Sequence, residues 1–250
     1  MKVDLILDAL ALPPESRISQ RVPKKLLAEQ GGKTAADRRQ IQDSIEELMW
    51  LAALKPIHIG VPAFRDQIRE YLEIAVLIVQ FRDSANDTRL TELIHRAIPY
   101  PLLLIAENSG RLTISLAHKR WSQAESTKTV IESVESVLLM NEFSAETEWF
   151  RQAVPLSRQP SRNLFTLYQG WIETVEALNA ARITGRYSKS SSEEVAAARR
   201  MALAEYTRIE REITSLRAQA EREKQVHRLA DINLEIHRLR KLQEEHVQKL

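Results

Sequence analysis

The C-terminal part of the chain has no helix-breaking residue, and this feature constrains the fold more than any other. Residues 186–250 contain neither Gly nor Pro and are rich in Ala, Glu, Arg, Leu and Gln, a composition typical of long helices. A straight helix from Ser191 onward would extend roughly 90 Å at ~1.5 Å per residue. The sequence therefore predicts a helical arm, formed either by one long helix or by a helical hairpin.

Two apolar seams run along this arm, out of phase with each other. Both advance by three and four residues, as a coiled-coil seam does, and the phase shift indicates either a local unwinding or a turn. Because a small domain cannot cover both seams of so long a helix, we expect the arm to bind another copy or another protein. The expected partner-binding residues are Tyr206, Ile209, Ile213 and Leu216 from the first seam and Leu229, Ile232, Ile236 and Leu239 from the second.

The remainder of the chain predicts an α+β fold with a small, mostly antiparallel sheet and packed helices. Helical spacing and cap residues predict helices over 4–10, 34–55, 88–98 and 163–183. Alternating or continuous apolar runs predict strands over 56–61, 72–81, 102–106 and 112–117, while 129–137 fits a strand or a helix. We thus expect a globular domain over 1–140, a helical connector over 141–185 and the arm over 186–250.

Composition excludes several classes of protein. The chain has no cysteine, which excludes disulfide scaffolds, thiolate zinc sites, iron–sulfur clusters and cysteine nucleophiles. Its 36 Lys and Arg nearly balance 34 Asp and Glu, so any nucleic-acid surface must be a local patch. The six glycines are scattered, which disfavours a phosphate-binding loop, and the six histidines form no metal-binding pair. We expect neither cofactor nor metal.

The N-terminus carries no convincing export signal. Asp4 and Asp8 interrupt its apolar stretch, and no small-residue cleavage site follows cleanly. The uninterrupted apolar run 74–79 is far shorter than the ~20 residues of a membrane helix. The sequence therefore predicts a cytoplasmic protein.

Three residues form a weak candidate for a metal-dependent nuclease centre. Glu73 precedes the predicted central strand, and Glu107 and Lys119 lie near the ends of neighbouring strands. Two carboxylates and a lysine could hold a divalent cation and stabilise developing charge. Their spacing differs from that of the common nuclease core, and a salt bridge at the edge of the sheet explains Glu73 better.

Two basic stretches are candidates for nucleic-acid contact. His118, Lys119 and Arg120 place three donors beside Trp121, a combination that suits phosphate binding with a base stacked on the indole. Lys24 and Lys25 belong to the second stretch, together with Arg17, Arg21 and Lys33. The alternative is a solvated strand end and a mixed surface, since residues 1–60 hold nine Lys and Arg against eight Asp and Glu.

Several short motifs occur in an order and spacing that a known family shares. They are Val22–Lys25, Trp50–Pro56, the strand that starts at Glu73, Arg96–Pro101, Leu116–Arg120, Glu223–Gln225 and Asn233–Ile236. Together they resemble the bacterial domain-of-unknown-function family numbered 4391, over essentially the whole chain. The resemblance implies a companion of helicase and DNA-methyltransferase subunits in phage-defence or restriction-type gene clusters, and it implies no catalytic residue.

These observations favour a non-catalytic accessory or adaptor subunit. The expected partner is a helicase or DNA methyltransferase bound through the arm, with DNA as a further contact of the globular part. The alternatives are a metal-dependent nuclease of the same kind of system and a free-standing coiled-coil homodimer.

Overall fold

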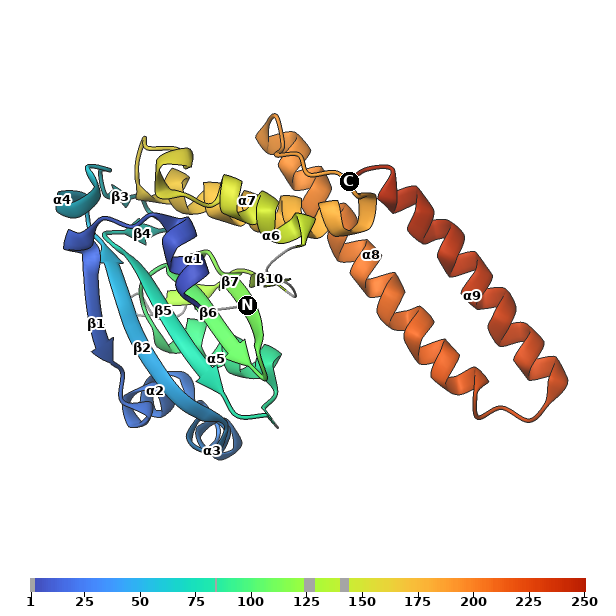
Figure 1. Cartoon of the computed structure of the whole chain (residues 1–250). Helices are drawn as coiled ribbons and strands as arrows, with labels where there is room; N and C mark the ends of the chain where they lie inside the picture. Colours follow the sequence, from blue (N-terminus) through green and yellow to red (C-terminus); the bar gives the residue numbers. More distant parts are fainter. Residues whose placement is uncertain (1–2, 84, 124–128, 140–143) are drawn as a thin grey trace. The chain divides into compact units, whose positions relative to one another are not determined.

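The computed structural model describes residues 3–83, 85–123, 129–139 and 144–250. The chain divides into two compact units, Met1–Val175 and Glu176–Leu250. The first unit is built on a sheet, and the second consists of helices (Figure 1). None of the described helices is both long enough and apolar enough to cross a bilayer.

A six-stranded sheet forms the centre of the first unit. Its strands are β1 (Arg17–Arg21), β2 (Ile45–Leu54), β5 (Ile74–Phe81), β6 (Leu102–Asn108), β7 (Arg111–Leu116) and β10 (Glu135–Leu139), in that spatial order. Only the β5–β6 pair among them is parallel, because the chain crosses over between these strands through helix α5 (Asp87–Ala97). The prediction of a mixed fold with a mostly antiparallel sheet is thus confirmed.

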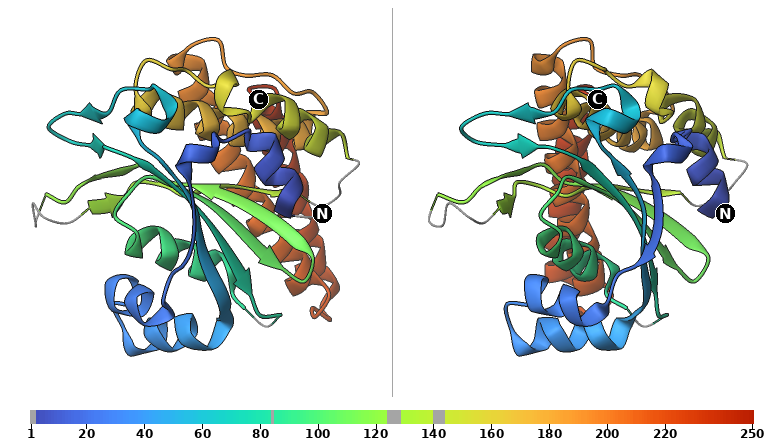
Figure 2. Two further views of the ribbon diagram at one scale, coloured as in Figure 1. Left: turned by 60° about the vertical axis from the view of Figure 1, so that its left-hand side comes forward. Right: turned by 90° about the vertical axis from the view of Figure 1, so that its left-hand side faces the viewer.

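Three helices cover one face of this sheet: α2 (Lys24–Gly31), α3 (Ala35–Ser44) and α5. The core between them is aliphatic, with Leu77 and Leu104 of the sheet packed among Leu27, Ile41 and Leu93 of the helices. Figure 2 shows these helices on the side of the sheet opposite to α1 (Val3–Leu10). Burial of this apolar face is the main force that holds the unit together.

Helix α2 approaches α5 unusually closely, and a glycine makes this possible. A Cβ atom on Gly31 would lie 2.6 Å from the carbonyl oxygen of Leu93 and 2.9 Å from the Cβ of Ala97. Both distances are shorter than side chains allow, so any other residue at position 31 would push the two helices apart.

Helices α1, α6 (Ala145–Ala153) and the first half of α7 (Leu164–Thr184) complete the unit. α1 packs against α6. The buried Tyr168 hydroxyl of α7 donates to the Leu102 carbonyl at 2.7 Å and accepts from the Ala117 N–H at 2.8 Å. It therefore satisfies backbone groups that lie beyond the Leu104–Ser115 pair, where the pairing of β6 with β7 ends.

Two small hairpins extend beyond the main sheet. One pairs β3 (Phe64–Arg65) with β4 (Glu70–Tyr71), and the other pairs β8 (Lys119–Trp121) with β9 (Thr129–Ile131). Residues 129–137, for which the sequence allowed a strand or a helix, contribute to two strands, β9 and β10. Short 3-10 turns at Pro14–Ser16 and Leu156–Arg158 complete the elements.

The helix predicted over 34–55 is wrong in its second half. Its start is confirmed, because Thr34 caps α3 and Asp37 completes the capping box. The helix ends at Ser44, and β2 follows. The register of β2 against β5 shifts at 45–47 and again at 50–52, so its buried residues do not alternate and imitate helical spacing.

The strand predicted over 56–61 is also wrong. Pro56–Ile59 forms the single helical turn α4, which ends at Gly60 with φ of +68°. A proline at the first helical position and a left-handed glycine after the last are typical helix-boundary signals, and they prevail over the short alternation of apolar residues.

The second unit contains the second half of α7 and a helical hairpin made of α8 (Glu193–Ala220) and α9 (Val226–Val247). Ile209 and Ile213 of α8 pack on Ile236 and Leu239 of α9, with Leu216 and Ile232 beside them. The two seams therefore face each other within the chain. We expected a partner because a small domain could not cover both seams. In the structure the two seams cover each other, so this reason for a partner no longer applies.

Candidate functional site

The three candidate nuclease residues do not come together. Gln80 of β5 pairs with Glu107 of β6, and Glu73 lies seven residues before Gln80, so the two carboxylates are about 23 Å apart along the sheet. Glu73 instead forms an ion pair with Lys55 at 3.5 Å. Within the described ranges no three His, Cys, Asp or Glu residues gather as metal ligands would. The geometry gives no support to a metal centre at these positions.

Lys119 has a structural position inside the protein. Its side chain is buried, and its ammonium donates to the carbonyl of Ile98 and, at 2.5 Å, to that of Tyr100. Both carbonyls follow the C-terminus of α5, where a cation is electrostatically favoured. Desolvation nevertheless lowers the pKa of Lys119 to about 7. Lys119 therefore binds the carbonyl groups at the end of α5 from inside the protein and is not accessible to a phosphate.

His95 of α5 is a buried neighbour of Lys119 that the sequence reasoning did not single out. Its Nε2 lies 3.0 Å from the Ser115 hydroxyl, while its Nδ1 has no hydrogen-bond partner among the described residues. Burial lowers the pKa of His95 well below its ordinary value, and Lys119 lowers it further. The available signal was its place on the apolar side of α5, directly after Ile94.

His118 is a link in a hydrogen-bonded chain. The Tyr71 hydroxyl lies 2.5 Å from its Nδ1, and Gln169 Oε1 lies 2.6 Å from its Nε2. In the neutral ring, Tyr71 donates to Nδ1 and Nε2 donates to Gln169, whose amide in turn donates to Glu173 at 3.2 Å. Phe165 packs on the imidazole with ring centroids 5.1 Å apart. These contacts hold His118 between β8 and α7. Both of its ring nitrogens are engaged within the chain, so His118 does not serve as an exposed donor to phosphate.

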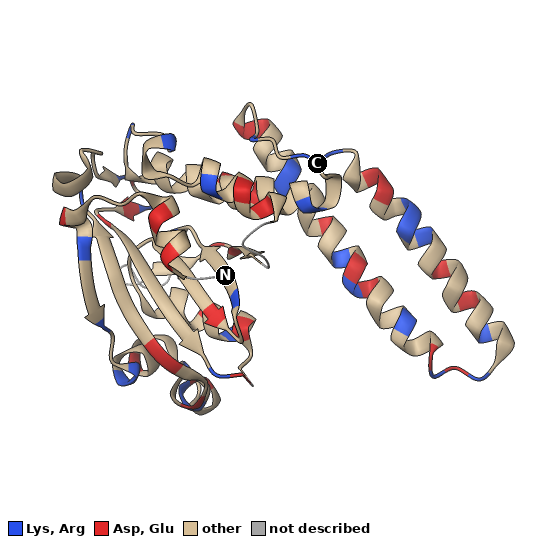
Figure 3. Cartoon of the chain, in the orientation of Figure 1, with Lys and Arg blue, Asp and Glu red and all other residues tan. Residues whose placement is uncertain are grey.

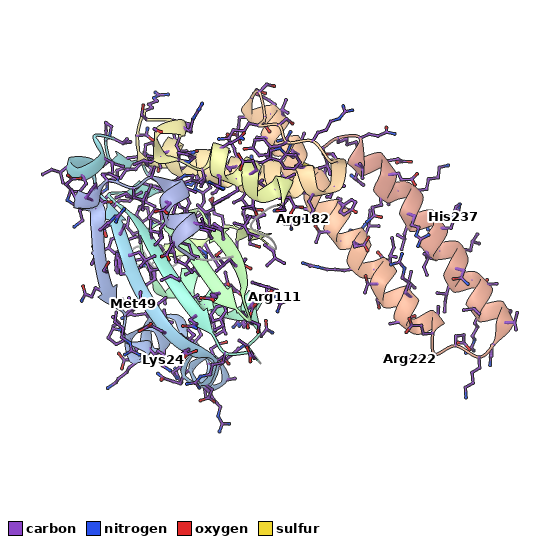
Figure 4. All side chains as sticks on the ribbon, in the orientation of Figure 1. Lys24, Met49, Arg111, Arg182, Arg222 and His237 are labelled. Carbon is purple, nitrogen blue, oxygen red and sulfur yellow. The ribbon has the colours of Figure 1, made fainter. Side chains whose placement is uncertain are left out.

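The other predicted nucleic-acid residues divide into occupied and accessible side chains. Lys24 donates to the carbonyls of Gln42 and Ile45 at 3.1 and 2.9 Å and so caps the end of α3 (Figure 4). Lys25 is exposed on α2. Arg120 and Trp121 are partly exposed, and Arg120 lies 4.0 Å from Glu132.

A large pocket lies beside the second basic stretch, and Arg21 and Lys33 of that stretch line it. Its volume is about 1040 Å³. One wall is α2 with the end of β1, and Trp50 of β2 lies beside it. The end of α5 and the β8–β9 hairpin supply the other walls. The right-hand view of Figure 2 shows α2 and the β8–β9 hairpin projecting on the same side as α5.

The pocket combines an apolar interior with cations. Val22, Leu27 and Ile98 belong to its apolar lining, and the charged residues around it are Arg21, Glu29, Lys33 and Arg96. Glu92 binds Arg96 at 2.5 Å and Arg89 at 2.8 Å, and Arg89 also binds Asp37 at 2.6 Å. The Arg89 guanidinium holds the pKa of Asp37 below its ordinary value, and the contact with Glu92 positions Arg96.

The comparison with protein families assigns the chain. A model described as domain of unknown function DUF4391 matches residues 10–242. The chain belongs to this family. The match extends over both compact units and confirms the resemblance that the sequence motifs indicated. No curated protein and no solved structure matches the chain.

Proposed function

We propose that this protein is a non-catalytic accessory subunit that binds a protein partner through the outer face of α9. This face consists of Val226, Ala230 and Leu234, which follow one another by four residues and are exposed. Val226 is 81% and Leu234 71% exposed. The observation that carries the proposal is this apolar row on a helix whose opposite side is already packed.

The hairpin does not need the outer face for its own stability. Its internal core is formed by Ile209, Ile213, Ile236 and Leu239. Ion pairs of Arg208 with Glu205 and Glu212 lie on exposed surface, and Figure 3 shows both signs of charge along α8 and α9. Apolar side chains among such charges favour contact with another apolar surface.

The resemblance of the sequence suggests which partner this is. It implies a helicase or a DNA-methyltransferase subunit of a phage-defence or restriction-type complex, acting on DNA inside the cell. The alternative of a metal-dependent nuclease gains no support from the positions of Glu73, Glu107 and Lys119. A homodimer through the same face is the remaining alternative, and it predicts self-association without a partner.

Co-purification tests this proposal. The full chain is co-expressed with the helicase or methyltransferase subunit encoded beside it, and the amount retained is compared between wild type and Leu234→Glu. The matched control is Ala218→Glu, which places the same charge on an exposed position of α8. We expect Leu234→Glu to lower retention at least tenfold and the control to leave it unchanged. Equal retention by all three proteins would contradict the proposal, as would a wild-type homodimer in light scattering that Leu234→Glu dissociates.

A further inference from the structure

We propose that the pocket between α2, α5 and the β8–β9 hairpin binds a segment of single-stranded nucleic acid. The inference goes beyond partner binding by α9 and rests on different residues. It also replaces the predicted contacts of Lys24, His118 and Lys119, whose polar groups are already engaged within the chain.

The size of the pocket fits a ligand larger than a single small molecule. Small-molecule sites commonly measure about 300–1,000 Å³, and this pocket, at about 1040 Å³, lies just above that range. The pocket is lined by several segments of the chain, which lie between Gln20 and Ile131 in the sequence. An extended strand of a few nucleotides, with bases turned inward, would use this volume.

Trp50 offers a stacking surface for a base. Its indole N–H already donates to the Ala52 carbonyl at 2.9 Å. The ring packs partly against the core and also lines the pocket, to which it contributes apolar surface. Tyr100 lies against it, with ring centroids 6.0 Å apart and planes inclined by 57°, which holds the indole in place. Stacking on aromatic side chains is sequence-tolerant and typical of single-strand binding.

Cations that line the pocket would bind the phosphates of the strand. The charged lining residues are Arg21, Lys33, Arg96 and Glu29. Glu92 binds Arg96, so Arg21 and Lys33 are the cations that can turn toward a phosphate. The ion pair of Arg21 with Glu47 is long, at 3.5 Å, and the Arg21 side chain is 69% exposed. A solvated pair of this kind exchanges readily for a phosphate.

Double-stranded nucleic acid does not suit this arrangement. In a duplex the bases stack on one another and the phosphates lie outside, so a duplex would reach the rim and leave the apolar interior empty. A single strand can place its bases against Trp50, Val22 and Ile98 while its phosphates remain near the cations. The pocket therefore selects unpaired strands.

The test measures the anisotropy of a labelled twelve-nucleotide oligothymidylate as the full-length protein is added, at two salt concentrations. The double variant Arg21→Ala/Lys33→Ala is compared with Arg17→Ala/Arg39→Ala, which removes equal charge from exposed positions on β1 and α3 outside the pocket. We expect the first to bind at least tenfold more weakly, with a salt slope lower by about 1.4, since each lost phosphate contact accounts for about 0.7. The control should stay within about twofold of wild type.

Two further measurements locate the bound strand. The oligonucleotide should quench part of the tryptophan fluorescence in wild type, and Trp50→Phe should lose that quenching while the three other tryptophans remain. Leu234→Glu should bind the oligonucleotide as wild type does, which separates this proposal from the partner site. Absence of wild-type binding, equal weakening by both double variants, or equally strong competition by a duplex or an apolar peptide would overturn it.

Discussion

Replacing Lys119 by methionine should remove much of the pH dependence of stability above neutral pH. The side chain is 3% exposed, and desolvation lowers its pKa from 10.5 to about 7. Because the folded pKa lies below that of the unfolded chain, the unfolded chain binds more protons between pH 7 and 10.5. Folding stability therefore rises with pH across this window and is insensitive to Lys119 below it.

The whole shift corresponds to about 5 kcal/mol at ~1.36 kcal/mol per pKa unit. Between pH 6.5 and 9.5 the same linkage relation gives a rise of about 3 kcal/mol in the free energy of unfolding of wild type. Lys119→Met lacks the titrating group and should lose this rise. It also leaves the Ile98 and Tyr100 carbonyls without their donor, a cost that is constant with pH and cancels when slopes are compared.

Urea unfolding of both proteins at pH 6.5, 8 and 9.5 measures the two slopes. Lys25→Met, which changes an exposed lysine of α2, controls for the loss of one charge and should keep the wild-type slope. Measurements stop at pH 9.5 because burial raises the pKa of Tyr71 and Tyr168, and their titration acts in the opposite direction. Parallel slopes for wild type and Lys119→Met would refute the reasoning.

Two other buried groups give further predictions. His95→Leu should remove the loss of stability that wild type shows as the pH falls below 6.5. The unfolded chain protonates His95 in this range, whereas burial keeps the imidazole of the folded chain neutral. Circular dichroism melts at pH 5 and 7 measure the loss, and an equal loss in both proteins would count against the prediction. Tyr168→Phe should lower the free energy of unfolding by about 1–3 kcal/mol, since the Ala117 N–H and Leu102 carbonyl lose their hydrogen-bond partner. Denaturant unfolding measures this difference. An unchanged free energy of unfolding would mean that water replaces the hydroxyl.

Most of the sheet was predictable because its strands carry strong local signals. β5 and β6 are nearly continuous apolar runs, and Asn108–Gly110 provides turn chemistry before β7. β2 was missed because its register shifts at two places, and a shift depends on the partner strand rather than on the sequence of β2. Local sequence patterns therefore predict where an element lies along the chain, but they do not predict the register of one strand against its neighbour.

The candidate site was much less predictable. Arg21 and Lys33 stood out only as members of basic stretches, and nothing local indicates that Arg96 and Ile131 complete the same pocket. Lys119 and His118 carried the right residue types, yet their backbone and side-chain partners lie 19 to 51 residues away. The meeting of the two seams likewise depends on the turn at 221–225, which contains neither Gly nor Pro.

The close approach of α2 and α5 at Gly31 has a mechanical consequence for the pocket. Helices α2 and α5, which form two of its walls, pack against each other at Gly31 with no room for a side chain between them. The β8–β9 wall forms a separate two-stranded sheet, anchored at Lys119 and tied through Trp121 to Ile68. The walls of the pocket are therefore fixed by different means: α2 and α5 by direct packing, and the β8–β9 wall by the hydrogen bonds of Lys119 and Trp121.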